Sequence, residues 1–261
     1  MKLNHSITGA DEGLPVLMVH GLFGQGRNLG AQARRLAQTR RVVLADMRNH
    51  GASPHSDDNS YAAMAGDLAE LIADLGGRVD LVGHSMGGKA SMVLALTHPE
   101  LVRRLVVMDI APIAYGHSQT THIDAMESVD LSHLTRRSDA DARLAERVPD
   151  PGIRAFLLQN LDLRAQPLEW RLNLRALREH MPQLVGWPDG LPAGTFPGKT
   201  LMLRGDRSDY VTTQGEAAAR HYFPQSRIVT LKNAGHWLHA DSPEAVADTL
   251  FAFLRDGDAA E

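Results

Sequence analysis

Short apolar runs rich in Val, Leu and Ile recur along the chain, and each is bounded by turn residues and followed by a longer helical pattern. This alternation is typical of parallel strands joined by helices. Because the runs are apolar almost without interruption, we expect helices to cover both faces of the sheet. The predicted strands are Val16 to His20, Arg41 to Asp46, Val79 to His84, Leu105 to Ile110, Thr200 to Gly205 and Arg227 to Leu231.

Two segments show clear helix signals. In "SYAAMAGDLAELIADLG" apolar residues recur at helical spacing, and Ser60 stands where an N-cap is expected. In "SPEAVADTLFAFL" Ser242 takes the N-cap position and Pro243 the first helical turn. We predict a helix in each segment, the second of them closing the fold.

The alternation of strands and helices stops after Ile110. From about Pro112 to Pro197 the pattern is helical, clearest in "RAFLLQNL" and "LEWRLNLRALREHM", with no convincing buried strand. We therefore predict a core of residues 1–111 and 198–261 and a helical cap insertion of residues 112–197. Ligands of open α/β folds bind at the carboxyl edge of the sheet, where this insertion leaves it, so a cap over an active site is the functional interpretation. A helical elaboration without substrate contact is the alternative.

Composition narrows the class of protein. The 261 residues are 43% hydrophobic and 22% charged, typical of a globular protein with a substantial core. A net charge of -4, with basic and acidic residues interspersed, argues against nucleic acid or an anionic membrane as partner. No apolar run is long enough for a membrane span, and the N-terminus lacks the apolar region of a signal peptide. We expect a soluble, cytoplasmic protein, monomeric or homodimeric, with a frayed C-terminal "RDGDAAE".

The stretch "LVGHSMGGKA" carries the strongest chemical signal. Gly83, Ser85 and Gly87 form G-x-S-x-G between a predicted strand and a predicted helix. A strand that turns sharply into a helix exposes the serine hydroxyl at the sheet edge, and larger side chains at the glycines would collide with neighbouring elements. We predict that Ser85 is a nucleophile.

A serine nucleophile needs a base, which in this chain order should follow the last strand. His236 lies in that position, in "LKNAGHWLHADSPE". His239, three residues on, suggests a metal pair, but no third ligand accompanies the two histidines, so we interpret it as structural or pocket-lining. The chain has no cysteine. We expect neither a metal nor an organic cofactor.

The oxyanion of an acyl-transfer intermediate needs preorganised N–H donors. The residue after the nucleophile normally provides one, here Met86. The loop "HGLFGQG" after the first core strand should provide the other, with the Leu22 N–H as first candidate and the Phe23 N–H as the adjacent one.

The acid that orients the base has two possible positions. The strand "LVVMDI" ends at Asp109, and the loop after "TLMLRG" contains Asp206 and Asp209. The residues alone leave all three carboxylates open.

Eight short stretches, spread from residue 20 to residue 244, match the motifs of a known family: "HGLFG", "DMRNHGASPH", "GHSMGGKA", "MDIAPI", "LVGW", "SDYV", "FPQSR" and "NAGHWLHADSPE". In these the chain resembles a subgroup of α/β-hydrolases, the small bacterial esterases of the YbfF type and their mitochondrial relatives of the ABHD-eleven subfamily. The resemblance implies an α/β-hydrolase fold, in which a mostly parallel central sheet has helices on both faces and a helical cap insertion. It also implies broad activity on short to medium acyl esters, with acyl-CoA thioesters as a further candidate class of substrate.

The resemblance places the acid in the "DIAP" motif, at Asp109. In most α/β-hydrolases the acid instead lies three residues before a Val, which here is Ser208, a residue that cannot serve as the acid. This chain keeps two carboxylates in "GDRSD" near that position, so Asp209 stays the alternative to Asp109.

Several residues are candidates for the substrate pocket. Phe156, Trp170 and Trp187 on the insertion are candidates to lie near the acyl group, or to be simple core. Asn49 and His50 are candidate polar contacts at the pocket mouth, and Arg48 a structural anchor. Lys89, Arg171, Arg175 and Arg178 could meet the phosphates of CoA, although such charges are usually solvated.

The sequence thus predicts an enzyme that hydrolyses a small-molecule carboxylic ester or thioester through an acyl-enzyme on Ser85. The same triad could run other chemistry, such as carbon–carbon bond hydrolysis or a lyase reaction like that of menaquinone synthesis. A non-catalytic ligand-binding module is a third possibility.

Overall fold

The sheet in a computed structural model of the chain has seven strands in the order β1-β3-β2-β4-β5-β8-β9. The structure describes residues 1–10 and 13–255, so most of the predicted C-terminal tail lies outside the described residues. All neighbouring strands are parallel except β1, which pairs antiparallel with β3. The strands are β1 (His5–Thr8), β2 (Val16–Val19), β3 (Val42–Ala45), β4 (Val79–His84), β5 (Val102–Met108), β8 (Lys199–Gly205) and β9 (Ser226–Leu231).

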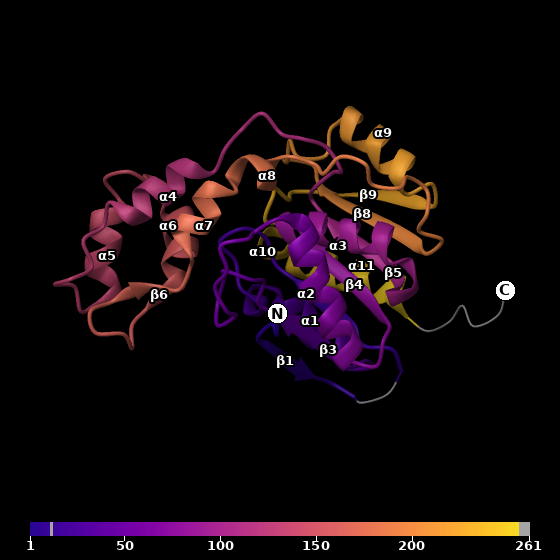
Figure 1. Cartoon of the computed structure of the whole chain (residues 1–261), viewed down its shortest axis with the longest axis horizontal. Coiled ribbons are helices and arrows are strands. Elements are labelled where there is room, and N and C mark those ends of the chain that lie inside the picture. The colour runs from indigo at the N-terminus through magenta and orange to yellow at the C-terminus, as the bar shows by residue number, and fades with distance from the viewer. Residues whose placement is uncertain (11–12, 256–261) are drawn as a thin grey trace.

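Both faces of the sheet are buried at its inner strands, as the uninterrupted apolar runs predict, whereas the edge strands β1 and β9 are largely exposed or half-buried. Successive residues of a strand point to opposite faces, so Val16 and Met18 of β2 pack into one apolar cluster and Leu17 and Val19 into the other. Helices α1 (Gly30–Leu36) and α11 (Pro243–Leu254) belong to the first cluster, and α2 (Tyr61–Asp74) and α3 (Met86–Thr97) to the second. Figure 1 shows this layered core on the right.

The predicted helix starts agree with the structure in position. The Ser60 hydroxyl accepts a hydrogen bond from the Ala63 N–H at 3.2 Å and caps α2. Ser242 occupies the N-cap of α11, but its side chain makes no capping bond. Strand β1 was not predicted, because its four residues are all exposed and its sequence is mostly polar.

The insertion, residues 112–197, leaves the core after β5 and returns before β8, and its elements α4 to α7 lie together beside the core (Figure 1). It is not wholly helical, because β6 and β7 form a short antiparallel hairpin between α6 and α7. The segment "LEWRLNLRALREHM" is therefore not helical from its start, because its Glu169 and Trp170 form β7. The elements are α4 (Thr120–Glu127), α5 (Arg137–Leu144), α6 (Pro151–Leu157), η3 (Leu158–Asn160), β6 (Leu161–Asp162), β7 (Glu169–Trp170), α7 (Leu174–Glu179) and α8 (Met181–Val185).

Of the remaining elements, three lie between core strands and α10 lies between β9 and α11. No helix among the described residues is long and apolar enough to cross a bilayer. These elements are η1 (Gly26–Leu29), η2 (Pro99–Leu101), α9 (Thr213–Tyr222) and α10 (Leu238–Asp241).

Candidate active site

Ser85 sits at a sharp turn between β4 and α3. Its backbone is in the left-handed region, with φ 52° and ψ -118°, which is costly for a residue with a side chain. The flanking glycines permit the turn, since a Cβ on Gly83 would lie 2.5 Å from the Gly87 carbonyl oxygen. The turn lets the Ser85 side chain line a cavity rather than enter the core.

Ser85, His236 and Asp109 form a continuous hydrogen-bonded line. The Ser85 hydroxyl lies 3.0 Å from Nε2 of His236, and Nδ1 of His236 lies 2.8 Å from Oδ2 of Asp109. With the imidazole proton on Nδ1, the ring donates to the carboxylate and Nε2 accepts from the serine hydroxyl. This is the geometry that general-base activation of a serine requires.

Asp109 is the carboxylate that contacts His236. It follows β5, has φ 52° and is fully buried. Its Oδ1 accepts the Gly205 N–H at 3.0 Å. Asp209 is exposed, and Asp206 is also exposed and accepts a hydrogen bond from the Ala234 N–H at 3.2 Å. Among the three carboxylates left open by the sequence, the structure brings Asp109 to the histidine.

Ser208 also takes part in this cluster, which sequence reasoning missed. Its hydroxyl donates a hydrogen bond to Oδ2 of Asp109. Ser208 cannot be the acid, but it stands in the usual acid position three residues before Val211 and reaches the carboxylate from there. That position was the signal that could have identified it.

The two proposed oxyanion donors lie beside Ser85. Met86 is the first residue of α3, so its N–H has no acceptor within the helix. In the described part of the chain the Leu22 N–H makes no loop hydrogen bond either, and both residues line the cavity. The Phe23 N–H donates to Nε2 of His50 at 3.1 Å and is therefore already engaged. Leu22 and Met86 are the available pair.

Around His236 the environment is aromatic. The Tyr210 ring stacks on the imidazole, with centroids 3.8 Å apart and planes at 17°. His84 lies 4.9 Å away and His239 packs against His84 at 4.6 Å, both measured between ring centroids. Burial lowers the pKa of His84 well below its usual range and that of His239 to about 4, so both stay neutral near pH 7. His239 lines the cavity, and no three metal-ligating side chains converge in residues 1–10 and 13–255.

A cavity of about 290 Å³ opens above Ser85 between the core and the insertion. Its wall is mainly apolar and includes Phe156, which packs against Trp237 with ring centroids 5.4 Å apart. Of the predicted pocket residues, Phe156 lines this cavity.

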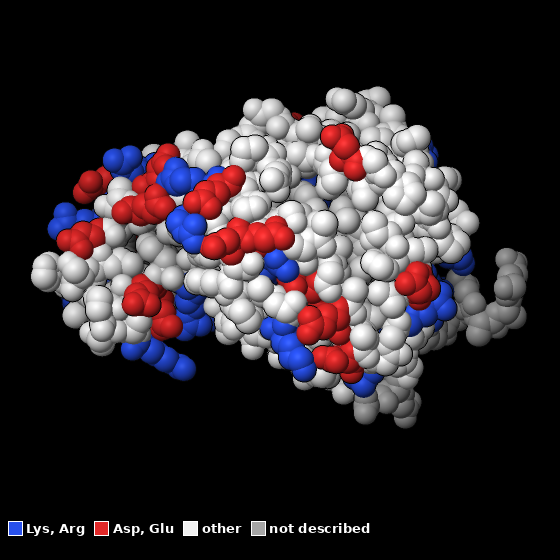
Figure 2. Space-filling view, in the orientation of Figure 1, with Lys and Arg blue, Asp and Glu red and all other residues white. Residues whose placement is uncertain are grey.

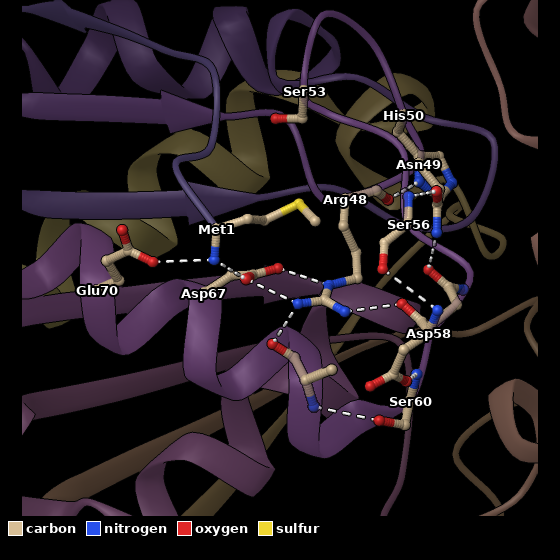
Figure 3. Close-up of polar contacts among 12 residues, drawn as sticks. Met1, Arg48, Asn49, His50, Ser53, Ser56, Asp58, Ser60, Asp67 and Glu70 are labelled. Carbon is tan, nitrogen blue, oxygen red and sulfur yellow. Dashed lines mark hydrogen bonds and ion pairs between the residues drawn. The ribbon is translucent and has the colours of Figure 1, made fainter.

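Four predicted pocket residues do not line it, which corrects those assignments. Trp170 donates through Nε1 to the Met126 carbonyl, inside the insertion, and Trp187 packs against Tyr222. Asn49 and His50 are fully buried and tie the loop after β3 to its neighbours. Figure 3 shows this loop, where Arg48 pairs with Asp67 through two bonds of 2.6 and 2.8 Å, as expected of an anchor.

The cations considered for CoA phosphates are engaged with other groups. Arg171 pairs with Asp162 at 3.2 Å, and Arg175 and Arg178 pair with neighbouring acids. Figure 2 shows blue and red side chains interspersed over the insertion. Lys89 is buried, and its ammonium donates to the carbonyls of Ile113, Val185 and Gly186, where the chain enters the insertion and where it approaches its end.

Comparisons with known proteins identify the family of this chain. Residues 16–249 match the model of a family described as "Alpha/beta hydrolase family". The chain is similar to the mouse sn-1-specific diacylglycerol lipase ABHD11, at 41% identity over 97% of this chain and 85% of that protein. It is also similar to esterase YbfF of Escherichia coli K12, at 36% identity over 98% of this chain and all of that protein. A solved structure titled "Marine microorganism esterase" superposes with a TM-score of 0.92 at 34% identity, covering 97% of this chain and 99% of that one.

Proposed function

This chain belongs to the α/β-hydrolase family and is an ester hydrolase, and we propose that its reaction runs through an acyl-enzyme on Ser85 with His236 as base and Asp109 as acid. The observation that carries the proposal is the unbroken line from the Ser85 hydroxyl through His236 to Asp109, with bonds of 3.0 and 2.8 Å.

The chemistry follows from those contacts. His236 takes the proton of the Ser85 hydroxyl as Oγ attacks the acyl carbon, and the Leu22 and Met86 N–H groups hold the oxyanion. Collapse of the intermediate breaks the acyl–oxygen bond, and His236 gives its proton to the leaving alcohol. Water then attacks the acyl-enzyme with His236 again as base, which frees the acid and restores the serine.

The cavity supports the proposed substrate range of short to medium acyl esters. Its apolar wall suits an acyl chain, and residues 112–197 supply a large part of that wall, including Ile153, Phe156 and Leu157. In this proposal residues 112–197 act as the cap of a core formed by 1–111 and 198–261. Thioesters of CoA stay possible substrates, but the ion pairs of Arg171, Arg175 and Arg178 do not favour them. Kinetics on matched esters and CoA thioesters of several acyl lengths would measure the preference.

The decisive test compares the protein with Ser85→Ala on p-nitrophenyl acetate and butyrate. We expect hydrolysis by the unaltered protein and a loss of about 10⁴-fold or more in kcat for the variant, because the nucleophile is gone. Full activity of Ser85→Ala would disprove the assignment. Turnover of a vinylogous diketone without ester turnover would instead indicate carbon–carbon bond hydrolysis, and no turnover of either would favour a binding module.

We also place the protein in the cytoplasm, as a monomer or homodimer. The absence of cysteine is compatible with a reducing compartment. Cell fractionation and sedimentation velocity test the two statements.

A further inference from the structure

Phe23, the residue that follows the oxyanion donor Leu22, is held from two sides, through its N–H and through its carbonyl. Phe23 comes directly after Leu22 and has φ 61°, an uncommon conformation for an aromatic residue. Its N–H donates to Nε2 of His50 in the core at 3.1 Å, and its carbonyl accepts from Nδ2 of Asn160 in the insertion at 2.8 Å. The residue next to the Leu22 N–H therefore has one contact with the core and one with the insertion.

On the core side, the histidine that accepts the Phe23 N–H is buried and hydrogen-bonded. The His50 ring is fully buried, and its Nδ1 lies 2.8 Å from the Arg48 carbonyl, which fixes the proton on Nδ1 and leaves Nε2 as acceptor. Burial lowers the pKa of His50 to about 3, so the ring stays neutral near pH 7. The Arg48–Asp67 pair anchors the same loop (Figure 3).

On the side of the insertion, the contact is made by the buried side chain of Asn160. Asn160 ends η3, is fully buried and does not line the cavity, so it has no direct route to a substrate. Its Oδ1 accepts from Nε2 of Gln25 at 3.1 Å, and its Nδ2 donates to the Leu157 carbonyl as well as to Phe23. Through Phe23 and Gln25, the amide of Asn160 contacts the loop that carries the oxyanion donor on either side of Gly24.

We propose that Asn160 is a positioning residue through which docking of the insertion on the core sets the geometry of the oxyanion hole. The inference rests on the proposed function, because it presumes an oxyanion at the Leu22 N–H. Donors stabilise the transition state only when they are preorganised at the place where the charge develops. An insertion that is displaced from the core would therefore leave the triad intact but the oxyanion hole incomplete.

Asn173 provides a matched control. It is also an asparagine of the insertion that contacts the core, since its Nδ2 lies 3.1 Å from Oδ1 of Asn49 and its N–H donates to the Asn49 carbonyl. Its side chain caps α7, and among the hydrogen bonds of residues 1–10 and 13–255 none joins Asn173 to Phe23. Asn173→Ala thus weakens docking of the insertion on the core loop after β3 without removing the bond to the Phe23 carbonyl.

The experiment compares Asn160→Ala with Asn173→Ala on p-nitrophenyl butyrate and on a trifluoromethyl ketone that forms a tetrahedral adduct with the serine. For Asn160→Ala we expect kcat to fall about 10- to 100-fold with KM within about threefold, and the affinity for the ketone to fall in parallel with kcat/KM. For Asn173→Ala we expect kcat within about threefold of the unaltered protein, even if its thermal stability falls as much as that of Asn160→Ala.

Equal loss of kcat in the two variants, or unchanged kcat in Asn160→Ala, would overturn the inference. Should Asn160→Ala not fold, Gln25→Ala removes the amide that holds Oδ1 of Asn160, and a kcat unchanged in that variant counts equally against it. Absence of both ester turnover and ketone binding in the unaltered protein would mean instead that the proposed function is wrong.

Discussion

Tyr210 lies face to face with His236, with ring centroids 3.8 Å apart and planes inclined by 17°. The tyrosine hydroxyl is held by side chains of the insertion, since Nε2 of His117 lies 3.0 Å from it and Nε2 of Gln119 donates to it at 3.3 Å. The stack therefore restrains the imidazole in the plane where its two nitrogens meet Ser85 and Asp109.

Replacing Tyr210 with Leu should lower kcat on p-nitrophenyl butyrate about tenfold, because the ring of His236 gains freedom to leave the productive orientation. Tyr210→Phe keeps the stacked ring and loses only the hydroxyl contacts, so we expect its kcat to stay within about threefold. Steady-state kinetics with separate kcat and KM values checks this. An equal loss in the Phe and Leu variants would assign the effect to the hydroxyl.

Asp109→Asn should lower kcat on the order of a thousandfold or more, since the amide cannot stabilise the imidazolium and favours the wrong tautomer of His236. Asp209→Asn is the matched control in the neighbouring loop and should change kcat little, because Asp209 is exposed. Circular dichroism verifies that both variants fold. The reverse order of the two effects would assign the acid to Asp209.

The activity should fall in acid, because His236 with a proton on Nε2 cannot take the proton of Ser85. The neighbouring His84 and His239 stay neutral near pH 7, since burial lowers the pKa of both. The measurement is kcat/KM from about pH 8 down to about pH 5. A flat profile across this interval would contradict the role of His236.

Lys89→Met should lower the free energy of unfolding by about 2 kcal/mol at pH 7, because three carbonyls at the two ends of the insertion lose their donor. Urea unfolding measures the change. We expect the methionine to fill the buried space, with Lys2→Met as an exposed control that leaves stability unchanged.

The effect of Lys89 should also depend on pH. Burial lowers the pKa of Lys89 to about 7 in the folded protein, whereas an unfolded lysine keeps an ordinary pKa near 10.5. Between these values the unfolded chain binds more protons, so the contribution of Lys89 to stability rises with pH. The difference in unfolding free energy between the unaltered protein and Lys89→Met should therefore be larger at pH 9 than at pH 7. Parallel pH curves would contradict this.

The fold was predictable because its signals are local. Uninterrupted apolar strands such as Val79–His84 can be recognised without knowing their neighbours, and the glycines around Ser85 mark the turn in the sequence itself. Strand β1 has no such pattern, since it lies at the sheet edge with its side chains exposed. The hairpin of β6 and β7 is only two residue pairs long, too short for a periodic signal.

The site was predictable only in part. Asp109, Asp206 and Asp209 all follow strands, and the residues by themselves leave the three open. The family resemblance favours Asp109, and the path of the chain brings that carboxylate to His236. Asn49 and His50 were assigned to the pocket because polar residues in loops often bind ligands. Their side chains instead satisfy buried backbone and amide groups, which the sequence of the loop alone does not reveal.

Ser85 and Asp109, at the ends of adjacent strands, both adopt left-handed backbone conformations, which cost on the order of 1–3 kcal/mol each. Glycine adopts such conformations readily, so a protein with Ser85→Gly should be inert yet harder to unfold than the active one. Selection for thermal endurance alone would therefore remove the proposed nucleophile, so at this turn stability and the proposed catalysis make opposite demands on the same residue.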